Sequence, residues 1–164
     1  MIVIEMENGK EIEIELMPEA APKTCENFEG LVKRGFYDGL IFHRVIRGFM
    51  IQGGCPNGDG SGDSGKKIEG EFSENGYKNN DIKHIEGVLS MARTQIPDSA
   101  SSQFFIMHHD APHLDGQYAG FGRVTEGLEI IDAIASVKTG NYGWYMQDVP
   151  EEPVVIDSME IVTK

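Results

Sequence analysis

The chain has 164 residues, of which 40% are hydrophobic and 25% are charged. This is ordinary globular composition, and the length favours one domain over two, because two smaller domains would have marginal cores. The net charge of −13 disfavours binding to nucleic acid or to an anionic membrane surface. No apolar run reaches the ~20 residues that span a bilayer.

The N-terminal residues alternate apolar and acidic side chains, whereas a secretory signal begins with basic residues and continues with an unbroken apolar run. The two cysteines, Cys25 and Cys55, lie outside any C-x-x-C spacing. Two free thiols in a reducing compartment are therefore expected in preference to a disulfide. We expect a cytoplasmic protein.

Alternation and turn residues predict the elements in chain order. Residues 2–7 and 11–16 alternate with period two on either side of Asn8-Gly9, which predicts a hairpin. Residues 21–36 carry apolar side chains at helical spacing, with Pro22 in the first turn and Gly35 at the end. Further strands are expected at 41–46, 49–52, 88–92, 103–107, 119–124 and 154–162, and a second helix at 128–137.

Two segments are interpreted as loops. Residues 55–67 alternate glycine with Asn, Asp and Ser, and a loop of this length in a compact domain is more often functional than idle. Residues 142–146, which include Trp144, are expected to pack over the sheet, with a patch for a partner as the alternative. Many short antiparallel strands with two helices favour a barrel, because closure removes exposed strand edges.

Three segments closely resemble signatures of the cyclophilin-type peptidyl-prolyl isomerases. They are FHRVIRGFMIQGG at 42–54, SQFFI at 102–106 and LDGQYAGFGRV at 114–124. They occur in the family's order and roughly at its spacing, and the likeness runs from the first hairpin to the last strand. The resemblance implies a mainly β fold: a closed eight-stranded antiparallel barrel capped by two α-helices. It also implies one isomerase domain over residues 1–164, with the active groove on the outer surface of the barrel.

The resemblance also assigns roles to the residues that match the family's motifs. Arg44 matches the catalytic arginine, and Gln52 matches the side chain that holds the substrate backbone. The walls of the proline pocket match Phe49, Met50, Phe105 and Leu114. The adjoining groove matches Ala92, the backbone of Arg93, and Gln103. We count Arg44, Phe49 and Gln52 as catalytic and the others as substrate-binding.

The chemistry explains why these residue types are needed. The peptide bond resists rotation because the nitrogen lone pair is conjugated with the carbonyl, with a barrier of roughly 18–20 kcal/mol. No bond breaks, so no nucleophile, metal or cofactor is required. A guanidinium that donates to the prolyl nitrogen would favour the twisted state, and Arg44 carries a permanent charge on a rigid fork.

The chain departs from the common family pattern at two pocket positions. His113 stands where many members carry a tryptophan at the pocket rim, and Tyr118 where many carry a histidine at its floor. Trp144 lies in a different segment and does not replace the missing indole. Both changes look like bacterial-type members. Catalysis should survive, but binding of cyclosporin, which uses that tryptophan, is predicted to be weak.

The expected partners are proline-containing peptides and unfolded protein chains, whose folding the enzyme would assist, and the expected state is a monomer. The main alternative is a binding module that keeps the groove without useful catalysis. The joint presence of Arg44, Phe49, Gln52 and Phe105 argues against it.

The sequence disfavours three other types of site. His108, His109, Asp110 and His113 suggest a metal site, but a strand end and turn would not fix ligand geometry there. The run from Asn57 mimics a calcium loop, but its twelfth position is Ile68 instead of Glu. No serine lies in a nucleophile-elbow context, which disfavours a hydrolase. His43 is interpreted as a packed structural histidine facing away from Arg44.

Overall fold

The computed structural model describes residues 1–142 and 146–163. The strands are β1 (Ile2–Met6), β2 (Glu11–Leu16), β3 (Arg44–Ile46), β4 (Met50–Gly53), β5 (Val88–Met91), β6 (Phe104–Met107), β7 (Gly120–Glu126), β8 (Thr139–Tyr142), β9 (Met146–Pro150) and β10 (Ile156–Ile161). The helices are α1 (Pro22–Lys33) and α2 (Leu128–Ala135), with short 3₁₀ turns at Ser73–Asn75 and Pro112–Leu114. None of the helices in these residues is both long and apolar enough to cross a membrane.

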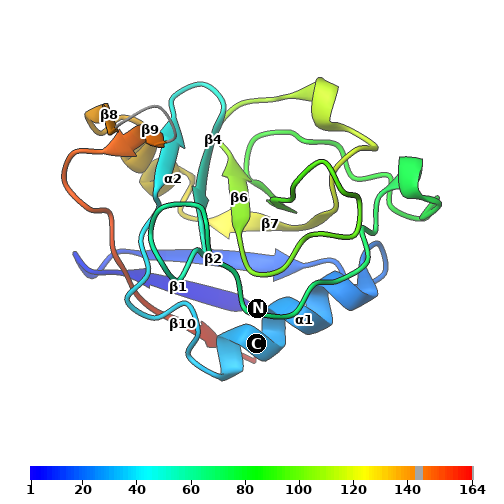
Figure 1. The fold of residues 1–164 in the computed structure, drawn as a ribbon. Coiled ribbons are helices and arrows are strands. Elements are labelled where there is room, and N and C mark those ends of the chain that lie inside the picture. Colours follow the sequence, from blue (N-terminus) through cyan, green and yellow to red (C-terminus); the bar gives the residue numbers. More distant parts are fainter. Residues whose placement is uncertain (143–145, 164) are drawn as a thin grey trace.

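Eight strands form one curled antiparallel sheet in the order β10-β1-β2-β7-β5-β6-β4-β3 (Figure 1). The mainly β fold with two helices is as expected, but a fully closed barrel is too strong a description. The edge strands meet through one isolated bridge, between Ile41 and Val155. Strand β3 begins only at Arg44 and β10 only at Ile156. The two chain segments therefore meet before either strand begins, and β3 and β10 form no ladder with each other.

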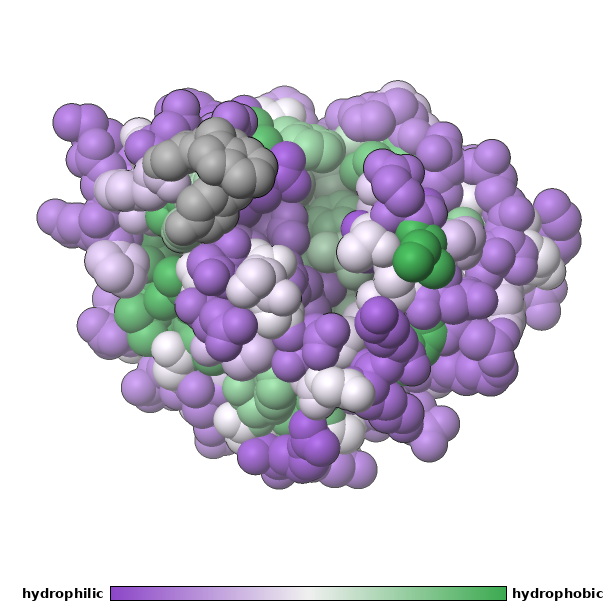
Figure 2. Space-filling view, in the orientation of Figure 1, coloured by the Kyte–Doolittle hydropathy of each residue, from purple (hydrophilic) through white to green (hydrophobic). Residues whose placement is uncertain are grey.

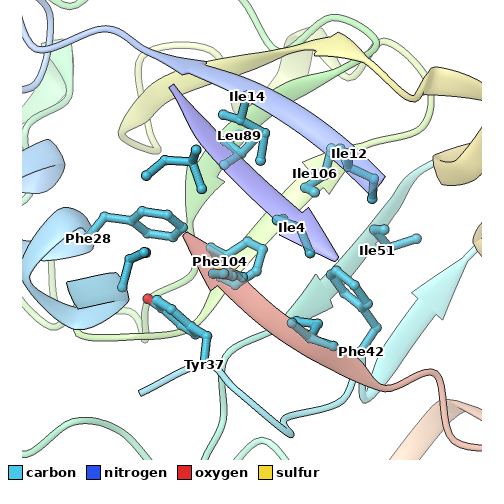
Figure 3. Packing of buried hydrophobic residues seen from close by; sticks show 14 of the residues in the cluster. Ile4, Ile12, Ile14, Phe28, Tyr37, Phe42, Ile51, Leu89, Phe104 and Ile106 are labelled. Carbon is cyan, nitrogen blue, oxygen red and sulfur yellow. The ribbon is translucent and has the colours of Figure 1, made fainter. Parts of the chain in front are cut away.

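The concave side of the sheet encloses the hydrophobic core (Figure 3). Alternation along β4 and β6 places Ile51, Phe104 and Ile106 on this side, each fully buried. Phe28 of α1 packs against Phe121 and Phe104, with ring centroids 5.1 and 5.5 Å apart. Helix α1 thereby covers one opening of the curled sheet, as its stripe of buried side chains requires.

The hairpin of β8 and β9 was not predicted: residues 142–146 were interpreted as a loop, and no strand was expected in the segments on either side of it. Its strands carry mostly exposed or half-buried side chains, so they lack the alternation that identifies a half-buried strand. The hairpin lies beside β3, at the outer edge of the large sheet (Figure 1). Trp144 lies outside the described residues, so the interpretation of its segment is untested.

Candidate active site

The outer face of the central strands carries a second apolar cluster. Residues that alternate with the core positions point outward: Met50 on β4, and Phe105 and Met107 on β6. Leu114, from the 3₁₀ turn, packs on the same cluster. Part of this cluster stays open to solvent, and Figure 2 shows a hollow with an apolar floor on this face of the molecule, surrounded by hydrophilic residues.

A cavity of about 160 Å³ lies over this cluster. Its walls come from five separate segments, so only folding brings them together. The lining residues are Arg44, Phe49, Met50, Gln52, Ala92, Arg93, Phe105, Leu114 and Tyr118. All nine were predicted as site residues. The cavity is small, has apolar walls and carries cationic and amide groups at its rim.

Two predicted site residues, Gln103 and His113, lie beside this cavity but outside its lining. His113 packs against Phe49, with ring centroids 6.0 Å apart, so it supports the wall that Phe49 forms. Gln103 lines a neighbouring depression of about 410 Å³ together with Arg44 and Gln52.

A chain of side-chain hydrogen bonds holds Arg44. Its Nη1 donates to Oε1 of Gln52 at 3.2 Å, and Nε2 of Gln52 donates to Oε1 of Gln103 at 3.0 Å. Nε2 of Gln103 in turn donates to the carbonyls of Gly60 and Gly62, both at 2.9 Å. Because both amide hydrogens of Gln103 are used by the loop, its oxygen must face Gln52, and this fixes which end of Gln52 faces Arg44.

The glycine-rich loop therefore contributes to the site through its backbone carbonyls. Gly60 has φ of 86°, a left-handed conformation that favours glycine. A side chain at Gly62 would begin 2.8 Å from Nδ2 of Asn57. The loop orients Gln103 through these two carbonyls, a contact that its composition did not predict.

Arg44 and Arg93 are both without a carboxylate partner among the described residues, although the chain has 27 acidic residues. An unpaired guanidinium keeps its donors available for a ligand. Arg34 and Arg47 also lack an ion pair within the described residues, so what sets Arg44 and Arg93 apart is that both line the cavity.

A buried histidine supports the pocket wall from behind, and the sequence analysis missed it. His84 stacks on Phe105 with ring centroids 6.1 Å apart. Its Nδ1 lies 3.1 Å from Oδ1 of Asp115 and its Nε2 lies 2.8 Å from Oγ of Ser90. Burial lowers the pKa of His84, with Asp115 acting in the opposite direction. A neutral ring that donates to Asp115 and accepts from Ser90 satisfies these contacts, and no local pattern around His84 indicates them.

His43 is buried as expected, but it is not kept apart from Arg44 on an opposite face of the strand. Both residues line the 410 Å³ depression, with Asp59. Nδ1 of His43 has no hydrogen-bond partner among the described residues. Burial, reinforced by the charge of Arg44, lowers the pKa of His43 to about 4, so its ring is neutral at pH 7.

The residues considered for a metal site have other contacts. His108 accepts a hydrogen bond at Nδ1 from the backbone N–H of Gly48 at 2.8 Å, and its Nε2 lies 2.8 Å from Oδ1 of Asp132. In the calcium-like loop, Asp59 accepts from the backbone and hydroxyl of Ser61. Within the described residues, no group of three or more His, Cys, Asp or Glu could hold a metal ion.

Comparison with known proteins identifies the family. The model of the cyclophilin type peptidyl-prolyl cis-trans isomerase family matches residues 1–161. The chain belongs to this family. It is therefore an enzyme of the isomerase class, as the sequence motifs predicted.

The relatives include bacterial isomerases. Peptidyl-prolyl cis-trans isomerase B of Bacillus subtilis is 52% identical over 124 residues, covering 76% of this chain and 82% of that protein. The isomerase of Acinetobacter baylyi is 44% identical over 165 residues, covering 97% and 85%.

Among solved structures, a cyclophilin type isomerase of Cryptosporidium parvum, crystallised in the presence of the dipeptide Ala-Pro, has a TM-score of 0.84 and 31% identity, with 99% of each chain covered. This likeness agrees with a curled eight-stranded sheet and two helices.

Proposed function

We propose that this isomerase accelerates rotation about Xaa-Pro bonds in unfolded or extended protein segments, and that Arg44 acts on the prolyl nitrogen. The observation that carries the proposal is an arginine that pairs with no carboxylate in the described part of the chain, at the rim of a small cavity lined by Phe49, Met50, Phe105 and Leu114. The walls of the cavity can surround a proline ring, and the guanidinium has N–H donors that its hydrogen bond to Gln52 does not use.

The mechanism follows from the electronic change during rotation. As the peptide bond twists, the nitrogen lone pair leaves conjugation with the carbonyl and becomes a better hydrogen-bond acceptor. A donor at that nitrogen therefore stabilises the twisted state more than either planar state. Arg44 supplies the donor, while Phe49, Met50 and Phe105 hold the ring as the preceding carbonyl swings.

The surroundings of Arg44 strengthen this effect. The relay through Gln52 and Gln103 fixes the guanidinium before substrate arrives, so little reorganisation accompanies the reaction. Apolar walls exclude water from the ring, which strengthens the interaction of Arg44 with the nitrogen. Each ~1.4 kcal/mol of selective stabilisation gives about tenfold in rate.

The test is the exchange of a short Ala-Pro peptide between cis and trans, measured by NMR with catalytic amounts of protein. We expect Arg44→Ala to reduce kcat/KM about 100-fold or more, as does removal of a transition-state donor in other enzymes. Arg44→Lys, which keeps the charge but loses the fork, should fall between the two. A two-dimensional amide spectrum of each variant shows whether it is folded.

Folded wild type that binds the peptide without accelerating its exchange would make the groove a binding site only, and the proposal would fail. If Arg44→Ala stays folded and keeps full activity, the isomerase reading stands but the role of Arg44 is wrong.

We further propose that the chain acts as one domain and as a monomer in the cytoplasm, where it assists folding. The monomer is supported by the pairing of the strands within the chain, and the cytoplasm by two buried free thiols, Cys25 and Cys55. Cyclosporin should bind weakly, because an imidazole at His113 offers less apolar surface than an indole.

A further inference from the structure

The side chain of Arg93 is clamped at the end of the cavity. Its guanidinium carbon lies 4.7 Å from the ring centroids of both Phe72 and Tyr118, so a cation lies between two aromatic faces. Its Nε and Nη2 donate to the carbonyl of Gln117 at 3.1 and 2.6 Å, and its Nη1 donates to the carbonyl of Thr94 at 2.9 Å. From the family resemblance, only the backbone of Arg93 was expected in the groove.

The clamp leaves binding capacity unused. A guanidinium has five N–H donors, and these contacts use three. Two donors on Arg93, one on each terminal nitrogen, have no partner among the described residues. A pair of donors on one rigid planar group suits a carboxylate, which offers two oxygens at matching separation.

The surroundings of Arg93 fix its position before any ligand binds. Glu71, next to Phe72, is fully buried and accepts hydrogen bonds from the backbone and hydroxyl of Thr24, at 2.6 and 2.7 Å, so this loop is anchored to the start of α1. A ligand at Arg93 therefore finds a side chain whose rotamers are already restricted, and this lowers the entropic cost of binding.

The floor below Arg93 has no room for a side chain. Phe72, Met91, Ala100 and Ala119 pack closely together beside Arg93. A bulky apolar side chain of a bound peptide cannot enter there while Arg93 holds its place. At this end of the groove, Arg93 therefore offers a positive charge and two N–H donors without a partner among the described residues.

We propose that Arg93 is a specificity-determining residue, which binds the carboxylate of an Asp or Glu in the segment flanking the proline of the substrate. This rests on the proposed function, because Arg93 lines the same cavity as Arg44. The net charge of −13 repels acidic peptide segments in general. Arg93 provides a local positive charge, so an acidic residue is accepted only at the substrate position that reaches it.

The test uses two series of peptides built on Ala-Ala-Pro-Ala-Ala, with Glu or its isostere Gln either two residues before or two residues after the proline. Exchange by NMR gives kcat/KM for each peptide, and the Glu:Gln ratio isolates the charge. We expect Arg93→Met to lower this ratio about fivefold in one of the two series, the size of a partly exposed charge pair. Arg93→Lys should lower it less.

The matched control is Arg123→Met, which changes the net charge equally on the exposed part of β7, where Arg123 pairs with Glu15 at 3.1 Å. If both variants change the ratio alike, or neither changes it, the inference is wrong. A measurement on wild type alone covers the case in which Arg93→Met does not fold: the Glu peptide should shift the Nε–Hε resonance of Arg93 more than the Gln peptide, and equal shifts overturn the inference. Absence of any acceleration, even for the all-Ala peptide, would instead refute the proposed function.

Discussion

The two faces of strands β4, β5 and β6 carry apolar side chains for different reasons. On the inner face, Phe104, Leu89 and Ile51 are fully buried and belong to the main core cluster. On the outer face, Phe105 and Met50 are nearly as buried, yet they border a cavity and end beside Arg44. Low exposure is common to both faces, so exposure alone does not separate core from site. What separates core from site is the set of residues that surround each side chain.

The sharpest way to test this contrast is to truncate two adjacent phenylalanines. Phe104→Ala leaves a closed void among Phe28, Tyr37 and Phe42, and should cost about 3–5 kcal/mol of unfolding free energy. Phe105→Ala opens into the existing cavity, which water can fill, so only the transfer term of about 2 kcal/mol is lost. Urea unfolding measures both values.

Activity should follow the opposite order. Phe105→Ala should reduce kcat/KM for an Ala-Pro peptide by at least about tenfold, the equivalent of one lost contact in the twisted state. Phe104→Ala should change it less, under conditions in which amide spectra show it folded. Equal losses of stability and of activity for both variants would erase the distinction between the two faces.

His43, which precedes β3 and lines the depression beside the cavity, is expected to make the fold sensitive to acid. Its pKa falls from 6.5 to about 4 on folding, so the unfolded chain takes up a proton that the folded chain refuses. The free energy of unfolding therefore keeps its full value above pH 6.5. It falls by up to about 3 kcal/mol as the pH decreases towards 4.

We expect His43→Leu to flatten the dependence of unfolding free energy on pH between 6.5 and 4, measured by urea unfolding at several pH values. His109→Leu removes an exposed imidazole and serves as the reference. A slope unchanged by His43→Leu relative to this reference would show that His43 is not the residue that resists protonation.

The smallest effect is expected at the turn that carries Phe49. His108 accepts a hydrogen bond from the backbone N–H of Gly48, and its own backbone N–H donates to the carbonyl of Phe49 at 2.8 Å. His108→Ala removes only the side-chain contacts, including that with Asp132, and should cost about 1 kcal/mol.

The neighbouring His109→Ala is the control, and an exposed substitution of this kind stays within about 0.5 kcal/mol. Faster hydrogen exchange at the Gly48 amide in His108→Ala alone would locate the effect in the turn. Equal exchange in both variants would show that His108 does not hold it.

The sequence predicted the fold where a local pattern reports burial. The Asn8-Gly9 hairpin and the helix after Ala21 appear close to their predicted limits, because their apolar spacing reflects one buried face. Hairpin β8–β9 was missed because its side chains bury little, and the degree of barrel closure depends on where distant edges meet.

Most residues of the cavity lining were predictable because they fall within the three family motifs, and Ala92 and Arg93 were predicted from the wider resemblance. What the motifs could not indicate are contacts made by side chains far apart in sequence. The stacking of Arg93 between Phe72 and Tyr118 depends on two loops, and the support of Phe105 by His84 depends on Asp115 and Ser90. Such contacts follow from packing in three dimensions, for which no spacing rule exists.

The bridge between Ile41 and Val155 has a mechanical consequence for Arg44. Strand β3 is secured on one side by its ladder with β4, and at its start by two backbone hydrogen bonds, from Phe42 to Val154 at 3.0 Å and from Ile156 to Leu40 at 2.8 Å. Strand β3 is thus paired with β4 along one side, the segment that leads into it is tied to the start of β10 by the bridge and its flanking hydrogen bonds, and β9 lies beside it. How steadily Arg44 is held therefore depends on residues near the opposite end of the chain.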